Sequence, residues 1–182
     1  MRRSWILPFF LLPAFLVGCP ALSLQDVSIA SVAPGPNQVT LKGNVVVTET
    51  DETEGEGKTA PEGRGVVALH LPEGWRAVTA RIQVPGESTV RGLSPAPQVG
   101  VQYTEAFPKT GGVWWAFVTT EQKIHQGTVS YPIEVDLEYP KKVKDGLVGI
   151  SVSPLQDEPK DLAAPALYRV DVRARTLAPT AL

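Results

Sequence analysis

The fold of this chain is decided at Ile133-Glu134-Val135-Asp136-Leu137-Glu138-Tyr139, where apolar and acidic residues alternate without interruption. A period of two is typical of a β-strand that has one buried and one solvated face. The core face takes Ile133, Val135, Leu137 and Tyr139, and the outer face takes Glu134, Asp136 and Glu138. The stretch therefore predicts a half-buried strand.

The same period recurs along most of the chain on both sides of this stretch. Turn signals separate the periodic segments, as at Pro72-Glu73-Gly74, Gly111-Gly112 and Asp145-Gly146. No segment shows a 3.6-residue apolar stripe, so any helix is expected to be short. The predicted strands are Asp26–Val32, Gln38–Thr48, Gly65–Leu71, Arg76–Val84, Gln98–Thr104, Val113–Thr119, Thr128–Tyr139, Leu147–Val152 and Leu167–Arg175.

About nine strands at this spacing favour an all-β fold, an antiparallel β-sandwich with immunoglobulin-like or cohesin-like topology. A closed barrel is the main alternative. The 16 glycines and 17 prolines fit many short strands joined by turns. The cysteine pair of true immunoglobulin domains is absent, and Trp75 and Trp115 are the candidates for the core tryptophan of such sandwiches.

The charge balance bears on the class of partner. The chain carries 19 acidic and 17 basic residues, and two of the basic ones, Arg2 and Arg3, lie at its start. Phosphate binding needs a concentrated basic face, so this balance argues against nucleic acid as a partner.

The first 19 residues have the layout of an export signal. Arg2 and Arg3 precede an apolar run from Trp5 to Val17, which ends in Leu16-Val17-Gly18-Cys19. This ending resembles the lipobox of bacterial lipoprotein signal peptides, in which a small residue precedes the cysteine. Cys19 is the only cysteine of the chain, so a disulfide cannot stabilise the domain.

The resemblance implies that residues 1–18 are cleaved and that the thiol of Cys19 carries lipid, in the family a diacylglycerol with acyl chains such as palmitate. Together with the strand pattern it divides the rest into a lipidated tether over 19–25, a β-sandwich domain over 26–176 and a C-terminal tail over 177–182. The expected location is the bacterial cell envelope, with the lipid bilayer as one partner, and Pro20 after the cysteine favours the outer membrane. The alternatives are an ordinary secretory signal and an uncleaved anchor, although a spanning helix needs about 20 apolar residues.

One long polar insertion, residues 49–64, holds a cluster of carboxylates. Calcium prefers oxygen ligands, but the spacing of a calcium loop is missing and a solvated loop is the favoured interpretation. Gly57-Lys58-Thr59 ends like a phosphate-binding loop, but that motif would need a glycine at the position of Glu52. The clustered carboxylates are Glu49, Asp51, Glu52, Glu54 and Glu56.

The sequence offers little catalytic chemistry. His70 and His125 are the only histidines, and neither has metal ligands at the required spacing, so no metal or cofactor is expected. Ser94 lies among prolines, which is the wrong context for a nucleophile elbow. Paired carboxylates can hydrolyse glycosides, yet the alternation of Glu134, Asp136 and Glu138 favours a solvated strand face. No catalytic residue is assigned.

Trp114 and Trp115 are the candidates for surface recognition. Adjacent strand residues face opposite sides, so one of the two joins Val113 and Phe117 in the core and the other faces outward. An outward ring can stack on a sugar or bind a partner protein, unless another segment covers it.

These observations predict a lipid-anchored envelope protein whose β-sandwich is a non-catalytic binding or structural module. Another envelope protein is the expected partner, with a glycan as the lesser option. One alternative is an envelope hydrolase that uses Glu134, Asp136 or Glu138 together with a histidine, in a cleft where burial raises a carboxyl pKa. The other is a small-molecule carrier with a cavity inside a barrel.

Overall fold

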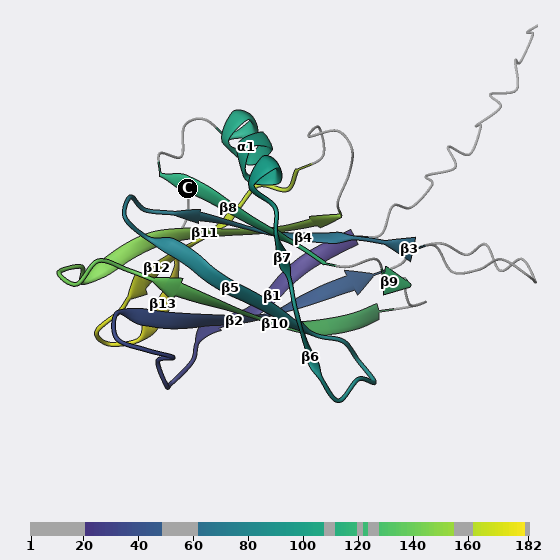
Figure 1. The fold of residues 1–182 in the computed structure, drawn as a ribbon, viewed down its shortest axis with the longest axis horizontal. Helices are drawn as coiled ribbons and strands as arrows, with labels where there is room; N and C mark the ends of the chain where they lie inside the picture. The colour runs from purple at the N-terminus through teal and green to yellow at the C-terminus, as the bar shows by residue number, and fades with distance from the viewer. Residues whose placement is uncertain are drawn as a thin grey trace, which may run out of the picture.

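A computed structural model describes residues 21–48, 62–107, 112–119, 122–123, 128–154 and 162–180. Two antiparallel sheets pack face to face, and one helix lies on the outer side of the second sheet (Figure 1). The five-stranded sheet runs in the order β1 (Ala21–Ile29), β2 (Gln38–Thr48), β10 (Thr128–Glu138), β5 (Arg76–Gln83) and β6 (Val90–Gly92). The six-stranded sheet runs in the order β13 (Thr176–Thr180), β12 (Ala166–Asp171), β11 (Asp145–Pro154), β4 (Gly65–Leu71), β8 (Val113–Val118) and β7 (Ser94–Pro95). A small third sheet pairs β3 (Glu62–Gly63) with β9 (Gln122–Lys123).

The predicted antiparallel β-sandwich is confirmed. Within the described ranges, nine strands have five or more residues, and the others have two or three. The two large sheets keep separate strand orders, so the closed-barrel alternative is wrong for the described strands.

The core lies between the sheets and contains the side chains that the alternation predicted. Ile133, Val135 and Leu137 are buried, and Tyr139 packs against them while remaining partly exposed. Trp75 is buried in the same core, and Trp115 is half-buried against it. Burial of this apolar surface is the main force that stabilises the cysteine-free domain.

The chain changes sheets between β6 and β7. β6 pairs with β5 in one sheet, and β7 pairs with the end of β8 in the other. Between them Leu93 is buried in the core, and its N–H donates a 2.8 Å hydrogen bond to the carbonyl of Ala80. This crossing joins the two sheets along one side of the sandwich.

One predicted strand is wrong. Residues Gln98–Thr104 belong to a helix, α1 (Pro97–Ala106), with proline in its first turn, where the missing N–H costs nothing. The alternation of Val99, Val101 and Tyr103 suggested a strand, but the buried residues are Gly100 and Tyr103, which are three apart and share one helix face. Packing of this face on β8 overrides the local pattern.

The predicted C-terminal strand Leu167–Arg175 is a hairpin. β12 ends at Asp171, whose carboxylate accepts hydrogen bonds of 2.8 Å from the N–H groups of Arg173 and Ala174. Arg175 then adopts a φ of 54°, and the chain returns as β13, within the segment expected to be a tail. A side-chain carboxylate that mimics a backbone turn is a local feature that a period-two pattern does not reveal.

The N-terminal boundary also differs from the prediction. β1 begins at Ala21 and ends at Ile29, so residues 21–25 belong to the sheet and not to a tether. Its register against β2 shifts between Gln25 and Ser28, where Asp26 has a φ of 52°. This bulge is the reason that the strand does not keep a single period.

Candidate functional site

The predicted carboxylates lie on the outer face of the five-stranded sheet, on its central strand. β10 pairs with β2 on one side and with β5 on the other, so each carboxylate has a neighbour from both strands. Glu134 and Glu138 are partly exposed, whereas Asp136 is buried with an exposed fraction of 7%. The prediction of a uniformly solvated face therefore fails at Asp136.

Asp136 is buried because neighbouring strands supply donors to both of its oxygens. The hydroxyl of Thr40 donates to Oδ1 at 2.6 Å, and that of Thr79 donates to Oδ2 at 2.7 Å. The guanidinium of Arg81 donates to both oxygens, at 2.8 and 3.2 Å. A buried carboxylate with this many donors is stable in its ionised form.

Glu134 extends the same network. It lies 2.8 Å from the ammonium of Lys42 on β2 and 3.2 Å from Arg81 on β5. Glu138 forms a separate pair with Arg76, at 2.7 and 3.0 Å. The outer face thus carries charges of both signs that largely neutralise one another.

The pKa values of the two inner carboxyl groups are lowered. Burial by itself raises the pKa of Asp136, but the hydrogen bonds from Thr40, Thr79 and Arg81 and the charge of Arg81 outweigh it. The hydrogen bond from Lys42 is the largest cause that lowers the pKa of Glu134. A glycosidase needs one carboxyl group with a raised pKa as its general acid, and Glu134 and Asp136 show the opposite shift.

His70 does not join these carboxylates. It lies on β4, in the other sheet, where it is buried beside Trp114 with a ring-centroid distance of 5.4 Å. Among the described residues there is no group of three His, Cys, Asp or Glu side chains that could hold a metal ion. The imidazole and the strand carboxylates are therefore on different sheets of the sandwich.

A wide hollow borders the charged face where the segment 29–34 leaves the sheet. It has a volume of about 600 Å³, and Thr40, Lys42 and Glu134 contribute to its wall. Because Lys42 and Glu134 pair with each other, the hollow presents little uncompensated charge to a ligand.

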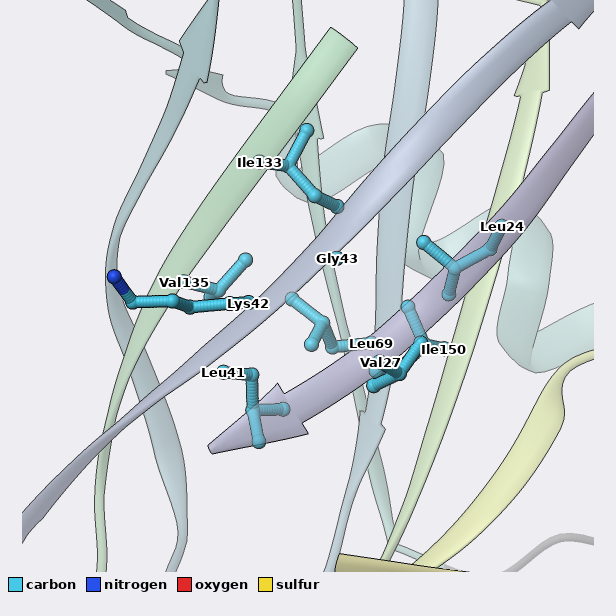
Figure 2. A pocket seen from close by; sticks show the side chains of 9 residues that line it. All are labelled: Leu24, Val27, Leu41, Lys42, Gly43, Leu69, Ile133, Val135 and Ile150. Atoms are coloured by element: carbon cyan, nitrogen blue, oxygen red, sulfur yellow. The ribbon is translucent and has the colours of Figure 1, made fainter. Parts of the chain in front are cut away.

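A small internal void lies between the two sheets beside Gly43. Figure 2 shows apolar side chains from both sheets around it, while the amino group of Lys42 points away. Its volume is about 10 Å³, close to the minimum for one water molecule. A void of this size cannot hold the cargo of a small-molecule carrier.

Trp114 is covered and does not offer an exposed ring. It points to the outer side of the six-stranded sheet, where α1 packs over it, and only 7% of it is exposed. Its ring lies 4.7 Å from that of Tyr103 and 5.8 Å from that of Phe107, measured between centroids. The expectation that Trp114 forms a recognition surface is therefore wrong, since α1 supplies the covering segment that the sequence did not reveal as a helix.

The small second core under α1 also contains a polar contact. The hydroxyl of Tyr103, which is fully buried, lies 3.0 Å from Oγ of Ser153 and 3.1 Å from Oγ of Ser151. Ser151 in turn donates to the carbonyl of Ala163 at 2.7 Å. These bonds fix α1 to β11 across the intervening strands.

α1 lies directly against the edge of β8. β7 pairs with β8 only at Phe117 and Val118, so the first half of β8 meets the helix where a strand would otherwise pair. A Cβ on Gly100 would lie 2.8 Å from the carbonyl oxygen of Trp114, a separation that real Cβ atoms do not show. Glycine at this position allows the close approach that covers the edge.

An apolar groove of about 430 Å³ remains between α1, β8 and β5. Val78, Val101 and Val113 line it, and their exposed fractions are 43%, 57% and 49%. Trp115 and Pro95 contribute to the same groove. Exposed large apolar side chains are informative when they gather at one place, and these three valines do.

A β-bulge directs Val78 to this groove. Asp136 pairs with Thr79 and Leu137 with Ala77, so Val78 has no partner on β10. Two successive residues of β5, Val78 and Thr79, are therefore exposed, which strict alternation would not allow. The sequence pattern indicated Trp115 but not Val78 or Val101, because neither the bulge nor the helix was predictable from the period. The expectation that Val113 lies in the core with Phe117 is wrong, since Val113 is 49% exposed at the start of β8.

Several sequence predictions lie outside the described residues. Cys19 and the leader, the acidic run from Glu49 to Glu56, Gly57-Lys58-Thr59 and His125 belong to this set. In the part of the chain that the structure describes, no helix has the length and hydropathy that a membrane span requires.

No protein-family model matches this chain, and no curated protein matches it significantly. Among solved structures, the collagen-binding domain of a Staphylococcus aureus adhesin has 10% identity and a TM-score of 0.40, over 80% of this chain and 95% of that domain. The collagen-binding subdomain of the Enterococcus faecalis surface protein ACE has 12% identity and a TM-score of 0.42, over 85% of this chain and 98% of that subdomain. AvmM, which catalyses macrocyclization in alchivemycin A biosynthesis, has 13% identity and a TM-score of 0.42, over 90% of this chain and 92% of AvmM. Two binding domains and an enzyme resemble the chain to the same low degree, so these likenesses do not identify its function.

Proposed function

We propose that this chain is a lipid-anchored protein of the bacterial envelope whose β-sandwich is a non-catalytic module that binds another envelope protein. The groove between α1, β8 and β5 is the proposed binding site. The observation that carries the proposal is the gathering of Val78, Val101 and Val113 beside Trp115, because these valines are three of the six large apolar side chains that are exposed among the described residues.

The shape of the groove suits an apolar segment of a protein. Its lining side chains carry no formal charge, so a bound charged group would lose hydration without gaining an ion pair. A partner segment with apolar side chains would match this lining.

The anchor in this proposal is the acylated Cys19. Only Pro20 separates Cys19 from β1, and two extended residues span about 7 Å, so the domain would lie close to the bilayer. Two or more acyl chains would make the attachment stable, since each buried CH₂ contributes about 0.8 kcal/mol. The outer membrane is the proposed site because of Pro20.

The experiment compares two double variants in the native envelope. Val101→Ser with Val113→Ser removes apolar surface from the groove, and Val90→Ser with Leu147→Ser removes it elsewhere, from side chains that are 55% and 39% exposed. After chemical cross-linking and affinity capture, a protein retained by the wild type should be lost from the groove variant and kept by the control variant. Identical sets of captured proteins in all three samples would contradict the proposal.

Unfolding must be excluded as the reason for any loss. All four side chains are substantially exposed, so both variants should keep the thermal midpoint of the wild type to within a few degrees. Circular dichroism of the purified proteins provides that check.

A further inference from the structure

The loops at one end of the sandwich carry a concentrated positive charge. We define the turn end as residues 30–37, 72–75, 139–144 and 172–175, which join β1 to β2, β4 to β5, β10 to β11 and β12 to β13 (left in Figure 1). Its cations are all exposed, and Glu73 is its only acidic residue. The cations are Lys141, Lys142, Lys144, Arg173 and Arg175.

Contacts between the loops show that they form one surface. The guanidinium of Arg175 donates to the carbonyl of Ser31, and the N–H of Tyr139 donates to the carbonyl of Asn37 at 3.0 Å. The N–H of Val172 donates to the carbonyl of Lys144, also at 3.0 Å.

The turn between β4 and β5 joins the same surface. The ring of Trp75 lies 5.5 Å from that of Tyr139, measured between centroids. The four loops are therefore held together by backbone and ring contacts and by the guanidinium of Arg175, while the side chains of all five cations remain exposed.

These cations are not neutralised within the described part of the chain. None of the five takes part in an ion pair between described residues. Two carboxylates border the surface: Asp171, which accepts backbone hydrogen bonds within its own turn, and Asp145, which lies 3.8 Å from Arg169. Together with Glu73 they are fewer than the five cations. The surface therefore retains a charge that an external partner can complement.

We infer that the turn end is a docking surface for an acidic, partly apolar segment of a partner protein. Carboxylates of the segment pair with the five cations. Val32, which is 76% exposed in the loop 30–37, supplies the apolar contact. A protein segment can offer an apolar contact to the exposed valine as well as carboxylates to the cations, whereas a simple polyanion offers charge alone.

The anchor in the proposed function makes lipid an unsuitable partner for this surface. β1 begins at the opposite end of the sandwich and extends over nine residues, about 30 Å, before it reaches the turn end. The Debye length at physiological salt is about 8 Å, so headgroup charges of the anchoring bilayer are screened at this distance. The exclusion of lipid as the partner rests on the proposed function, whereas the charge of the turn end does not.

The test uses the full chain in a non-ionic detergent and a fluorescent synthetic peptide of alternating glutamate and leucine. Lys141→Gln with Lys142→Gln and Lys144→Gln should weaken peptide binding at least about threefold at low salt. The matched control, Arg64→Gln with Arg91→Gln and Lys123→Gln, removes the same charge from residues outside the turn end, next to β4, on β6 and on β9, and should leave binding within about twofold. Replacement of the three lysines by arginine should retain it.

Three results would overturn the inference. Equal weakening in the turn-end and control variants would mean that only net charge matters. Loss of binding in the arginine variant would mean that the folding of the loops, not their charge, is responsible. Tighter binding to anionic phospholipid vesicles or to polyphosphate than to the peptide would assign the surface to a lipid or another polyanion. None of these outcomes involves the groove, so the proposed function would stand or fail separately.

Discussion

The hydroxyl of Thr40 on β2 donates a 2.6 Å hydrogen bond to the carboxylate of Asp136 on β10, and both side chains are buried. The contact joins residues 96 positions apart, on the outer face of a sheet where alternation alone predicts solvent. Thr79 and Arg81 complete the donor set from the other side. Asp136 thus links the three central strands of the five-stranded sheet.

Replacing Asp136 by asparagine should lower the free energy of unfolding by about 2–3 kcal/mol at neutral pH. The change leaves donors from Thr40, Thr79 and Arg81 partly unsatisfied. The expected loss of stability is smaller than for breaking a fully buried ion pair, because the side chain of Arg81 is 36% exposed. Glu138→Gln is the control, because its pair with Arg76 is largely exposed and should contribute less than about 1 kcal/mol. Urea denaturation measures both, and equal effects would contradict the role given to Asp136.

The same residue should make stability depend on pH. The folded-state pKa of Asp136 is lowered, so its contribution is present above the unfolded value of about 3.9 and is lost as the pH falls through the folded value. The difference in unfolding free energy between the wild type and Asp136→Asn should therefore shrink below about pH 4. Denaturation series at several pH values test this, and a difference that stays constant down to pH 2 would refute it.

Two glycine positions should respond oppositely to alanine. At Gly100 a Cβ would lie 2.8 Å from a backbone oxygen, so Gly100→Ala should destabilise the protein by about 1–3 kcal/mol. At Gly43 the nearest atom is the mobile Cδ1 of Leu24, at 3.1 Å, and a small void adjoins it. Gly43→Ala should therefore be neutral or stabilising by up to about 1 kcal/mol. Thermal denaturation of the two variants decides whether the contact of α1 with β8 is as close as described.

Trp114→Ala should lower the stability of the protein and should not remove an exposed recognition surface. Only 7% of the residue is exposed, so truncation of the side chain should lower the free energy of unfolding by about 3–5 kcal/mol. Calorimetry would show the loss. A variant of unchanged stability would mean that the ring is accessible after all.

Cys19→Ser should abolish lipid attachment and leave the sandwich folded. The described domain has no cysteine, so the substitution removes no contact within it. Mass spectrometry of the native protein should find a diacylglycerol-modified N-terminal cysteine that the variant lacks. An unmodified N-terminus or a retained leader in the wild type would contradict the proposed anchor.

The sequence was sufficient wherever a residue's role depends on its own strand. Alternation from Ile133 to Tyr139 identified the core face, and the bounds of β2 and β4 were predicted to the residue. These features follow from a period of two and from turn residues, both of which are local properties. The turn-end lysines were also visible as a run, Lys141-Lys142-Val143-Lys144, but nothing local indicated which loops would surround them.

The sequence by itself determined that this chain is all-β with one acidic outer strand, because the pleat forces neighbouring side chains to opposite faces. It favoured a sandwich but left a closed barrel open. Only the tertiary structure decided that Asp136 is buried, that α1 covers Trp114 and that Val78 joins a groove. Each of these depends on which strand lies next to which, and on one bulge. Strand order is set by contacts between residues far apart in the chain. A periodic pattern fixes the face on which a side chain lies but does not show which strand lies beside it.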